Sequence, residues 1–212
     1  MAHIVITSGP TRQYLDPVRY LTNSSSGRMG SCLAQSALNL GHQVTVVSGP
    51  VQVDYPIAAT VIDVITTQQM LSATQELFAS ADGLIGAAAP CDYMPMHIAE
   101  HKLAKTGNGL QLSLVETPDI VATLGSLKRS NQWIVGFALE TEDIRFRAIV
   151  KMTRKCCDMI VSNSAEAMNA ESNSVEIILR GGTTIEQVEG PKKLVADAIL
   201  KQIQAHLIEK YS

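Results

Sequence analysis

Residues 3–40 read HIVITSGPTRQYLDPVRYLTNSSSGRMGSCLAQSALNL and contain a strand pattern, a long polar connection and a helix pattern. The β-branched run at residues 3–7 predicts a short buried strand that stops at Ser8-Gly9-Pro10. The helical pattern begins near Arg28, so about twenty residues lie between the two elements. An ordinary connection between a strand and its following helix takes about 2–6 residues. We therefore expect this loop to have a function of its own.

The rest of the chain alternates in the same way. Short apolar runs predict strands and amphipathic runs predict helices, at residues 43–48, 60–65, 83–88, 133–138 and 159–162 for strands and at residues 68–79, 120–127 and 144–157 for helices. Residues 174–188 indicate a β-hairpin that turns at Gly181-Gly182, and Pro191 opens a last helix. This order predicts one domain over residues 1–212, a Rossmann-like three-layer α/β fold whose mostly parallel sheet has helices on both faces and ends in a hairpin plus helix. We expect Leu40 and Leu194 to face its core.

Composition narrows the class of protein. The net charge of −3 gives no general attraction for nucleic acid or an anionic membrane, so we expect neither as a partner. No apolar run reaches the roughly 18 residues of a membrane span, and no signal segment precedes the first strand. The four cysteines form no C-x-x-C pair and the histidines show no ligand spacing, which predicts no metal site of its own, reduced thiols and a cytoplasmic location.

Ligands of open α/β sheets bind beyond the carboxyl ends of the strands, so the loops there are the first candidates. After the first strand, Ser24 to Gly30 offers hydroxyls, glycines and the free N–H groups of a helix start, which suit a phosphate. A serine that only caps the helix is the alternative interpretation. The segment matches neither G-x-G-x-x-G nor the P-loop pattern, which argues against an NAD enzyme or a P-loop kinase.

A second candidate loop, GAAAPCDYMPMHIAEHKLAKTG, follows the fourth strand at residues 86–107. The small residues Gly86, Ala87 and Ala88 let a ligand approach the backbone, and Asp92 lies just past the strand end. Lys102 can bring a point charge to a phosphate, while a solvated loop with ordinary surface charges is the alternative.

Two later segments complete the candidate set. ETPDIVATLG at residues 116–125 starts a helix that we place with Pro118 at its first position, and VGFALET at residues 135–141 ends a strand with Phe137 at the ligand edge. The next helix carries Arg147, Lys151 and Lys155 at four-residue spacing, on one face. These three cations either bind an anion or form a solvated stripe.

Together the segments resemble the phosphopantothenate–cysteine ligase family, the synthetase half of the bifunctional coenzyme A biosynthesis flavoprotein. The resemblance rests on TSGPTRQYLDPVRYLTNSSSGRMG, AAAPCDYMPMHIAEHKLAK, TPDIVATL, VGFALET and DMIVSNS, which follow the family's order over nearly the whole chain. The chain departs from the family pattern at Arg28, where Lys is common, at Pro90-Cys91, and in a lysine loop thinned to Lys102 and Lys105.

The resemblance implies a ligase that joins 4′-phosphopantothenate and L-cysteine through an acyl-nucleotide, with CTP as co-substrate and Mg²⁺ as cofactor. It also implies a homodimer, no FMN, and a separate phosphopantothenoylcysteine decarboxylase as a partner. The family's nucleotide-binding positions fall on Gly86, Ala87, Ala88, Asp92, Lys102, Pro118, Asp119, Ile120, Val121, Phe137, Lys151 and Lys155. Its substrate-binding positions fall on Arg19, Asn23, Ser24, Ser25, Ser26 and Gly27, with Asn23 and Lys102 in catalytic roles.

Two other interpretations stay open from the residues alone. A Rossmann-type NAD(P) oxidoreductase needs an acidic residue at the end of its second strand, whereas this strand ends VVSGP. A non-catalytic nucleotide-binding module is the other, and it predicts no pyrophosphate release from any nucleotide.

Overall fold

One eight-stranded sheet forms the centre of the structure, a computed structural model that describes residues 1–140, 142–164 and 172–209. The strand order is β12-β11-β10-β9-β6-β1-β4-β5. The strands are β1 (His3–Ser8), β4 (Gln43–Ser48), β5 (Thr60–Asp63), β6 (Gly83–Gly86), β9 (Trp133–Glu140), β10 (Met159–Ser164), β11 (Ser172–Leu179) and β12 (Thr183–Pro191). The predicted fold class is therefore confirmed.

The chain starts in the middle of this sheet and builds it outward in both directions. From β1 it runs to β4 and β5 on one side, and then returns to β6, β9 and β10 on the other, all in parallel. The last two strands, β11 and β12, pair antiparallel as the predicted hairpin. The order reverses between β1 and β6, and such a switch point is where open α/β sheets bind ligands.

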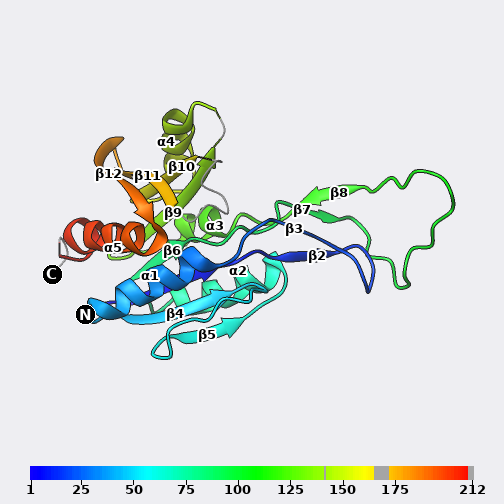
Figure 1. Ribbon diagram of the computed structural model, residues 1–212, viewed down its shortest axis with the longest axis horizontal. Helices are drawn as coiled ribbons and strands as arrows, with labels where there is room; N and C mark the ends of the chain where they lie inside the picture. The colour runs from blue at the N-terminus through cyan, green and yellow to red at the C-terminus, as the bar shows by residue number, and fades with distance from the viewer. Residues whose placement is uncertain (141, 165–171, 210–212) are drawn as a thin grey trace.

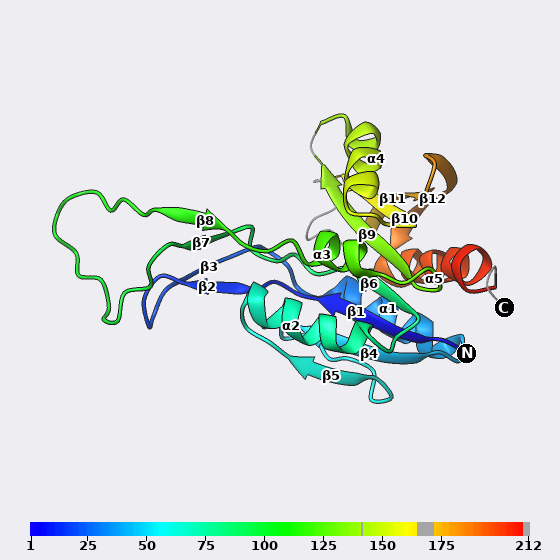
Figure 2. The same cartoon turned by 180° about the vertical axis from the view of Figure 1, so that it is seen from behind.

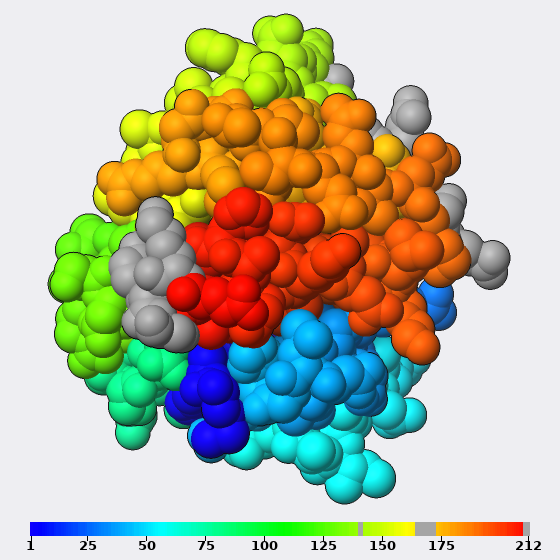
Figure 3. Space-filling view, turned by 90° about the vertical axis from the view of Figure 1, so that its left-hand side faces the viewer, coloured from blue at the N-terminus to red at the C-terminus, as the bar shows by residue number. Residues whose placement is uncertain are grey.

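Helices cover both faces of the sheet because its strands bury alternate residues on opposite sides. Ile4 and Ile6 belong to the core beneath α1 (Arg28–Asn39) and α5 (Lys192–Ile203). Helix α5 continues as a short π-helical turn at Gln204–Ile208. Figure 3 shows α5 beside α1 at the end of the molecule where both termini lie. Val5 belongs to the opposite core, beneath the helices α2 (Thr67–Phe78), α3 (Ile120–Leu127) and α4 (Ile144–Arg154).

A long arm projects from the body at the carboxyl end of β1 and β6 (Figures 1 and 2). It consists of two antiparallel pairs, β2 (Arg12–Tyr14) with β3 (Tyr20–Thr22) and β7 (Tyr93–Pro95) with β8 (Leu114–Glu116). The connection between β7 and β8 forms its far tip. We define the arm as residues 12–22 and 93–116.

Several local expectations are wrong. Leu40 and Leu194 are each 49% exposed and lie outside the core. Pro118 precedes the cap of α3 rather than opening the helix, because Asp119 is the N-cap. The N-cap of α1 is Gly27, in the left-handed region at φ 74° with no side-chain cap bond, so the serines before it do not cap this helix.

Among the described residues, no helix has the length and apolar content to cross a membrane.

Candidate functional site

Two cavities flank the carboxyl end of β6, one on each face of the sheet. Gly86 and Ala88 line the first, of about 440 Å³, and Ala87 lines the second, of about 150 Å³. Successive residues of an extended chain point to opposite faces, which explains this division. Phe137, in the neighbouring β9 one residue past the position that pairs with Gly86, lines both cavities. We call the larger one cavity A and the smaller one cavity B.

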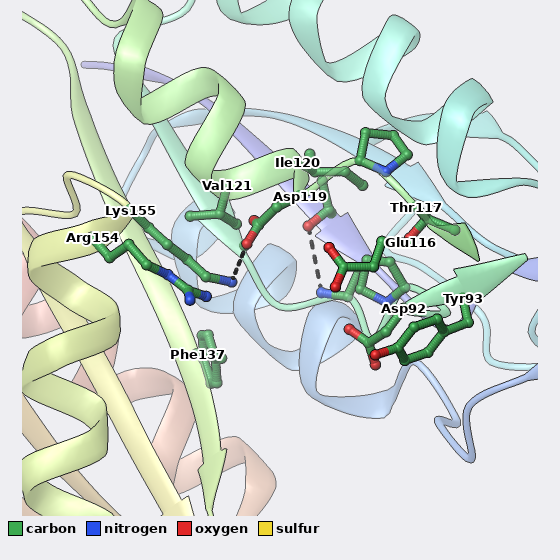
Figure 4. A pocket seen from close by; sticks show the side chains of 15 residues that line it. Asp92, Tyr93, Glu116, Thr117, Asp119, Ile120, Val121, Phe137, Arg154 and Lys155 are labelled. Carbon is green, nitrogen blue, oxygen red and sulfur yellow. Dashed lines mark hydrogen bonds and ion pairs between the residues drawn. The ribbon is translucent and has the colours of Figure 1, made fainter. Parts of the chain in front are cut away.

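Cavity A collects side chains from five places in the chain. Its walls are Thr7, Gly86, Ala88, Pro90, Asp92, Tyr93, Glu116, Thr117, Pro118, Asp119, Ile120, Val121, Phe137, Arg154 and Lys155. Figure 4 shows Arg154 and Lys155 on one wall, with Asp92, Tyr93 and Glu116 across from them. The cavity therefore presents cations and carboxylates on facing walls.

Lys155 is held in cavity A by the start of α3. Its ammonium nitrogen lies 3.0 Å from an Asp119 carboxylate oxygen, and the other oxygen of Asp119 accepts the Ala122 N–H at 3.0 Å as the helix cap. Gly125 allows the close packing behind this pair, because a Cβ there would lie 2.0 Å from the Lys155 carbonyl oxygen. The close approach of Gly125 to the Lys155 backbone thus fixes α3 beside Lys155.

The electrostatics keep Asp119 ionised. Burial alone raises the pKa of Asp119, but the Ala122 hydrogen bond and the charges of Lys155 and Arg154 outweigh burial and hold the pKa below its ordinary value. The Asp119 carboxylate neutralises part of the positive charge of Lys155 and Arg154 on this wall. Lys155 and Arg154 together still leave one wall of cavity A positive, next to the apolar ring of Phe137.

The opposite wall of cavity A presents two carboxylates. Asp92 and Glu116 are exposed carboxylates that line cavity A. Within the described ranges, no three His, Cys, Asp or Glu side chains cluster as a metal site. Mg²⁺ in nucleotide enzymes is held by one or two carboxylates together with the substrate's phosphates, so these two residues fit a metal that enters with the nucleotide.

Cavity B lies at the start of α1. It is lined by Ser24, Ser25, Ser26, Gly27, Arg28, Met29, Gly30, Ala87, Ala89, Phe137, Leu139, Asn163, Asn173 and Lys192. The glycines bring the helix start onto the sheet, because a Cβ at Gly30 would lie 2.0 Å from the Ser8 hydroxyl oxygen. The first-turn N–H groups of α1 therefore lie beside the end of β1.

Asn23 stands at the junction of the arm and the two cavities. Its side-chain amide donates to the carbonyl of Pro90, a residue of cavity A, at 2.8 Å. Asn23 also borders a shallow depression together with Ser24, Ser25 and Ser26. A side-chain amide has two N–H donors, so this bond leaves Asn23 a second one for a ligand.

Two candidates, Arg19 and Lys102, lie on the arm and line neither cavity. Arg19 donates to the Leu103 carbonyl at 2.7 Å and lies 3.5 Å from the carboxylate of Asp16. Asp16 is fully buried and accepts the N–H groups of Val18, Arg19 and Leu103. These bonds pin the backbone beside Lys102 to the β2–β3 turn, while the Lys102 side chain is exposed.

The cations of α4 separate in the structure. Lys155 lines cavity A, whereas Lys151 and Arg147 do not. Arg147 instead forms an ion pair of 3.4 Å with Glu142. Residues that the sequence did not single out also line the cavities, namely Tyr93, Glu116, Thr117 and Arg154 in cavity A and Asn163, Asn173 and Lys192 in cavity B. The strand-end rule could have suggested Asn163, since DMIVSNS ends β10 beside β9.

Comparisons with known proteins agree with this architecture. Residues 1–207 match the family described as DNA/pantothenate metabolism flavoprotein C-terminal domain. The chain is 39% identical over 207 residues to the coenzyme A biosynthesis bifunctional protein CoaBC of Vibrio vulnificus, which covers 95% of this chain and 51% of that protein. Its identity to CoaBC of Bacillus subtilis is 39% over 208 residues, covering 96% of this chain and 51% of that protein. The chain thus spans about half the length of these relatives.

Solved structures give the same result. The C-terminal domain of CoaBC superposes with a TM-score of 0.84 at 36% identity, covering 98% of both chains. A mutant of Cab2 in complex with phosphopantothenate-cysteine superposes with a TM-score of 0.82 at 16% identity, covering 99% of this chain and 87% of that chain, which shows a shared fold.

Proposed function

The chain belongs to the family of DNA/pantothenate metabolism flavoprotein C-terminal domains, and from this premise we propose that it is a phosphopantothenate–cysteine ligase. It joins 4′-phosphopantothenate to L-cysteine at the expense of CTP and yields 4′-phosphopantothenoylcysteine, an intermediate of coenzyme A biosynthesis. The observation that carries the proposal is the pair of cavities on opposite faces of the β6 end, which meet at Ala87, Ala88 and Phe137. Two substrates bound there would react at the strand end.

The reaction has two steps. A carboxylate oxygen of phosphopantothenate attacks the α-phosphorus of CTP, a P–O bond forms, and the bond to the departing pyrophosphate breaks. The cysteine amine then attacks the acyl carbon of the acyl-CMP, the C–N bond forms, and CMP leaves while the amine proton passes to solvent. Both steps develop negative charge on oxygen, so catalysis is mainly positioning and charge neutralisation.

In this proposal cavity A holds the nucleotide. Gly86 and Ala88 allow the base to approach the strand end, Phe137 packs against it, and the Pro118–Val121 turn closes the wall. Lys155 meets the phosphates together with Arg154, the other cation that lines the cavity. Mg²⁺, bound through Asp92 and Glu116, would neutralise phosphate charge.

The long first loop holds the acid substrate. Ser24 to Gly27 bind phosphopantothenate in cavity B, and Asn23 donates its second N–H to the acyl carbonyl. Loss of that donor would leave the growing charge on the carbonyl oxygen without a partner during attack by the amine. This assignment gives the unusual length of the loop a purpose.

We further propose a homodimer in which the arm of one copy reaches the cavities of the other. The arm exposes many large apolar side chains, Val18, Tyr20, Tyr93, Met94, Met96, Ile98, Leu110, Leu112 and Leu114. This concentration of exposed apolar side chains on one part of the molecule fits a surface that a protein partner covers. Arg19 and Lys102 line neither cavity of their own chain, and a second copy would bring them to the substrate.

Pyrophosphate release tests the function directly. Purified protein is incubated with phosphopantothenate and with CTP, ATP, GTP or UTP in turn, with and without cysteine. We expect release with CTP above all and amide product only when cysteine is present. No release with any nucleotide would favour a binding module, and a fluorescence change on titration with NADH would favour the oxidoreductase alternative.

A further inference from the structure

Two cations from distant parts of the chain meet at cavity B. Arg28 is the first residue of α1 and Lys192 is the first residue of α5, and both line the cavity. No Asp or Glu is among the described residues that line it. Cavity A, in contrast, has three carboxylates among its walls. Cavity B therefore has the charge balance of an anion site.

Lys192 is held in place by a buried amide. Its ammonium donates to the side-chain oxygen of Asn173 at 2.9 Å, and Asn173 is only 5% exposed on β11. Burial lowers the pKa of Lys192, and the neighbouring charge of Arg28 lowers it further. A bound anion would relieve this repulsion and favour the charged form of Lys192, which burial disfavours.

Polar groups on the other walls fit the same ligand. The start of α1 is capped by Gly27 without a side-chain bond, so its first-turn N–H groups remain available to a ligand. The side-chain oxygen of Asn163 is buried and has no hydrogen-bond partner within the described part of the chain. A side-chain amide can turn to present either its oxygen or its N–H groups to a ligand.

We propose that Lys192 and Arg28, with the first turn of α1 and Asn163, bind a phosphate group of a substrate in cavity B, and that Asn173 positions Lys192. The inference rests on the proposed function and adds side chains from β10, β11 and α5 to the loop assigned above. The group is the 4′-phosphate of phosphopantothenate or a phosphate of the nucleotide. Both groups present negatively charged phosphate oxygens that accept charge-assisted hydrogen bonds.

The test compares Lys192→Gln with Lys193→Gln by calorimetric titration. Lys193 is the matched control, because it is the next residue of α5, is exposed and does not line the cavity. Removing one charge-assisted hydrogen bond should raise the Kd for the phosphate-bearing substrate about ten- to a hundredfold in Lys192→Gln. The Kd for pantothenate, which lacks the phosphate, should stay unchanged, and Lys192→Arg should restore most of the affinity.

The arms of the experiment separate the two sources. A higher Kd for phosphopantothenate alone identifies the 4′-phosphate, and a higher Kd for CTP alone identifies the nucleotide. Equal Kd values of Lys192→Gln and Lys193→Gln for phosphopantothenate and for CTP would overturn the proposal, and so would a rise in the Kd for pantothenate as large as the rise for phosphopantothenate. Inorganic phosphate is titrated in parallel, so that a charge effect at Lys192 is still measured if the parent shows no ligase activity.

Discussion

Cavity A and the arm differ in what fixes their side chains. In cavity A, Asp119 caps α3 and Phe137 lies within β9, and both of these elements contribute residues to the buried core. On the arm, local polar bonds do this work, as Asp16 and Arg19 hold the backbone of Leu103. Tyr93 and Glu116, at the base of the arm, still line cavity A, whereas Arg19 and Lys102, farther out, line neither cavity of their own chain.

Asn23 tests this comparison at the point where the two regions join. We expect Asn23→Ala to slow amide formation about 10²–10³-fold, because one donor to a developing oxyanion is lost. Pyrophosphate release should fall much less, since that step develops no charge on the acyl carbonyl. Rapid-quench measurement of both steps decides the matter, and an equal loss in each would remove Asn23 from this role.

The arm predicts a defect in the opposite step. We expect Lys102→Gln to reduce pyrophosphate release by roughly a hundredfold, because its charge would meet the phosphates as pyrophosphate leaves. The thermal midpoint should be unchanged, since the side chain is exposed. Lys105→Gln, on the same exposed loop, is the control, and release at the parent rate in Lys102→Gln would contradict the assignment.

Mixed dimers show whether the arm acts on its own chain or on a partner. With CTP kept below the KM of the parent, we expect Lys102→Gln and Lys155→Ala subunits, each poorly active alone under this condition, to recover about a quarter of the parent's activity when coexpressed, because half of the dimers would then hold one intact composite site. Activity no higher than the mean of the two variants would show that each arm serves its own subunit.

The division between body and arm also explains what the sequence predicts. The strands of the body follow from runs of apolar residues, whereas the sequence places the start of α3 at Pro118, one residue before the observed cap Asp119. The arm strands hold three residues each and show no such run. Lys192 and Asn173 reach cavity B only through the packing of α5 and β11, which local sequence does not encode. The phase of α4 near its end likewise hides that Arg154, rather than Lys151, lines cavity A.

The cations beside cavity A should affect nucleotide affinity more than turnover. We expect Lys155→Ala and Arg154→Ala, which remove the two cations lining cavity A, each to raise the KM for CTP about ten- to a hundredfold with little change in kcat, because both meet phosphates already present in the ground state. High salt should weaken nucleotide binding more in the parent than in the double mutant. Arg147→Ala, whose partner is Glu142, is the control. An unchanged KM for all three would indicate a solvated stripe.

The smallest effect concerns the wall of cavity A itself. Asp119→Asn keeps a good helix cap and removes only the ion pair with Lys155. The Asp119 side chain is 38% exposed, so solvent screens this ion pair. We expect a loss of about 0.5 kcal/mol in the free energy of unfolding at pH 7. Because the folded state lowers the pKa of Asp119, this stability is present above the ordinary carboxyl pKa and is lost as the pH falls through the lower folded value. Urea unfolding at pH 7, 5 and 3 should show the parent and the variant converging only at the lowest pH; a difference that grows on acidification would show that burial, rather than Lys155 and the Ala122 N–H, sets the charge of this wall.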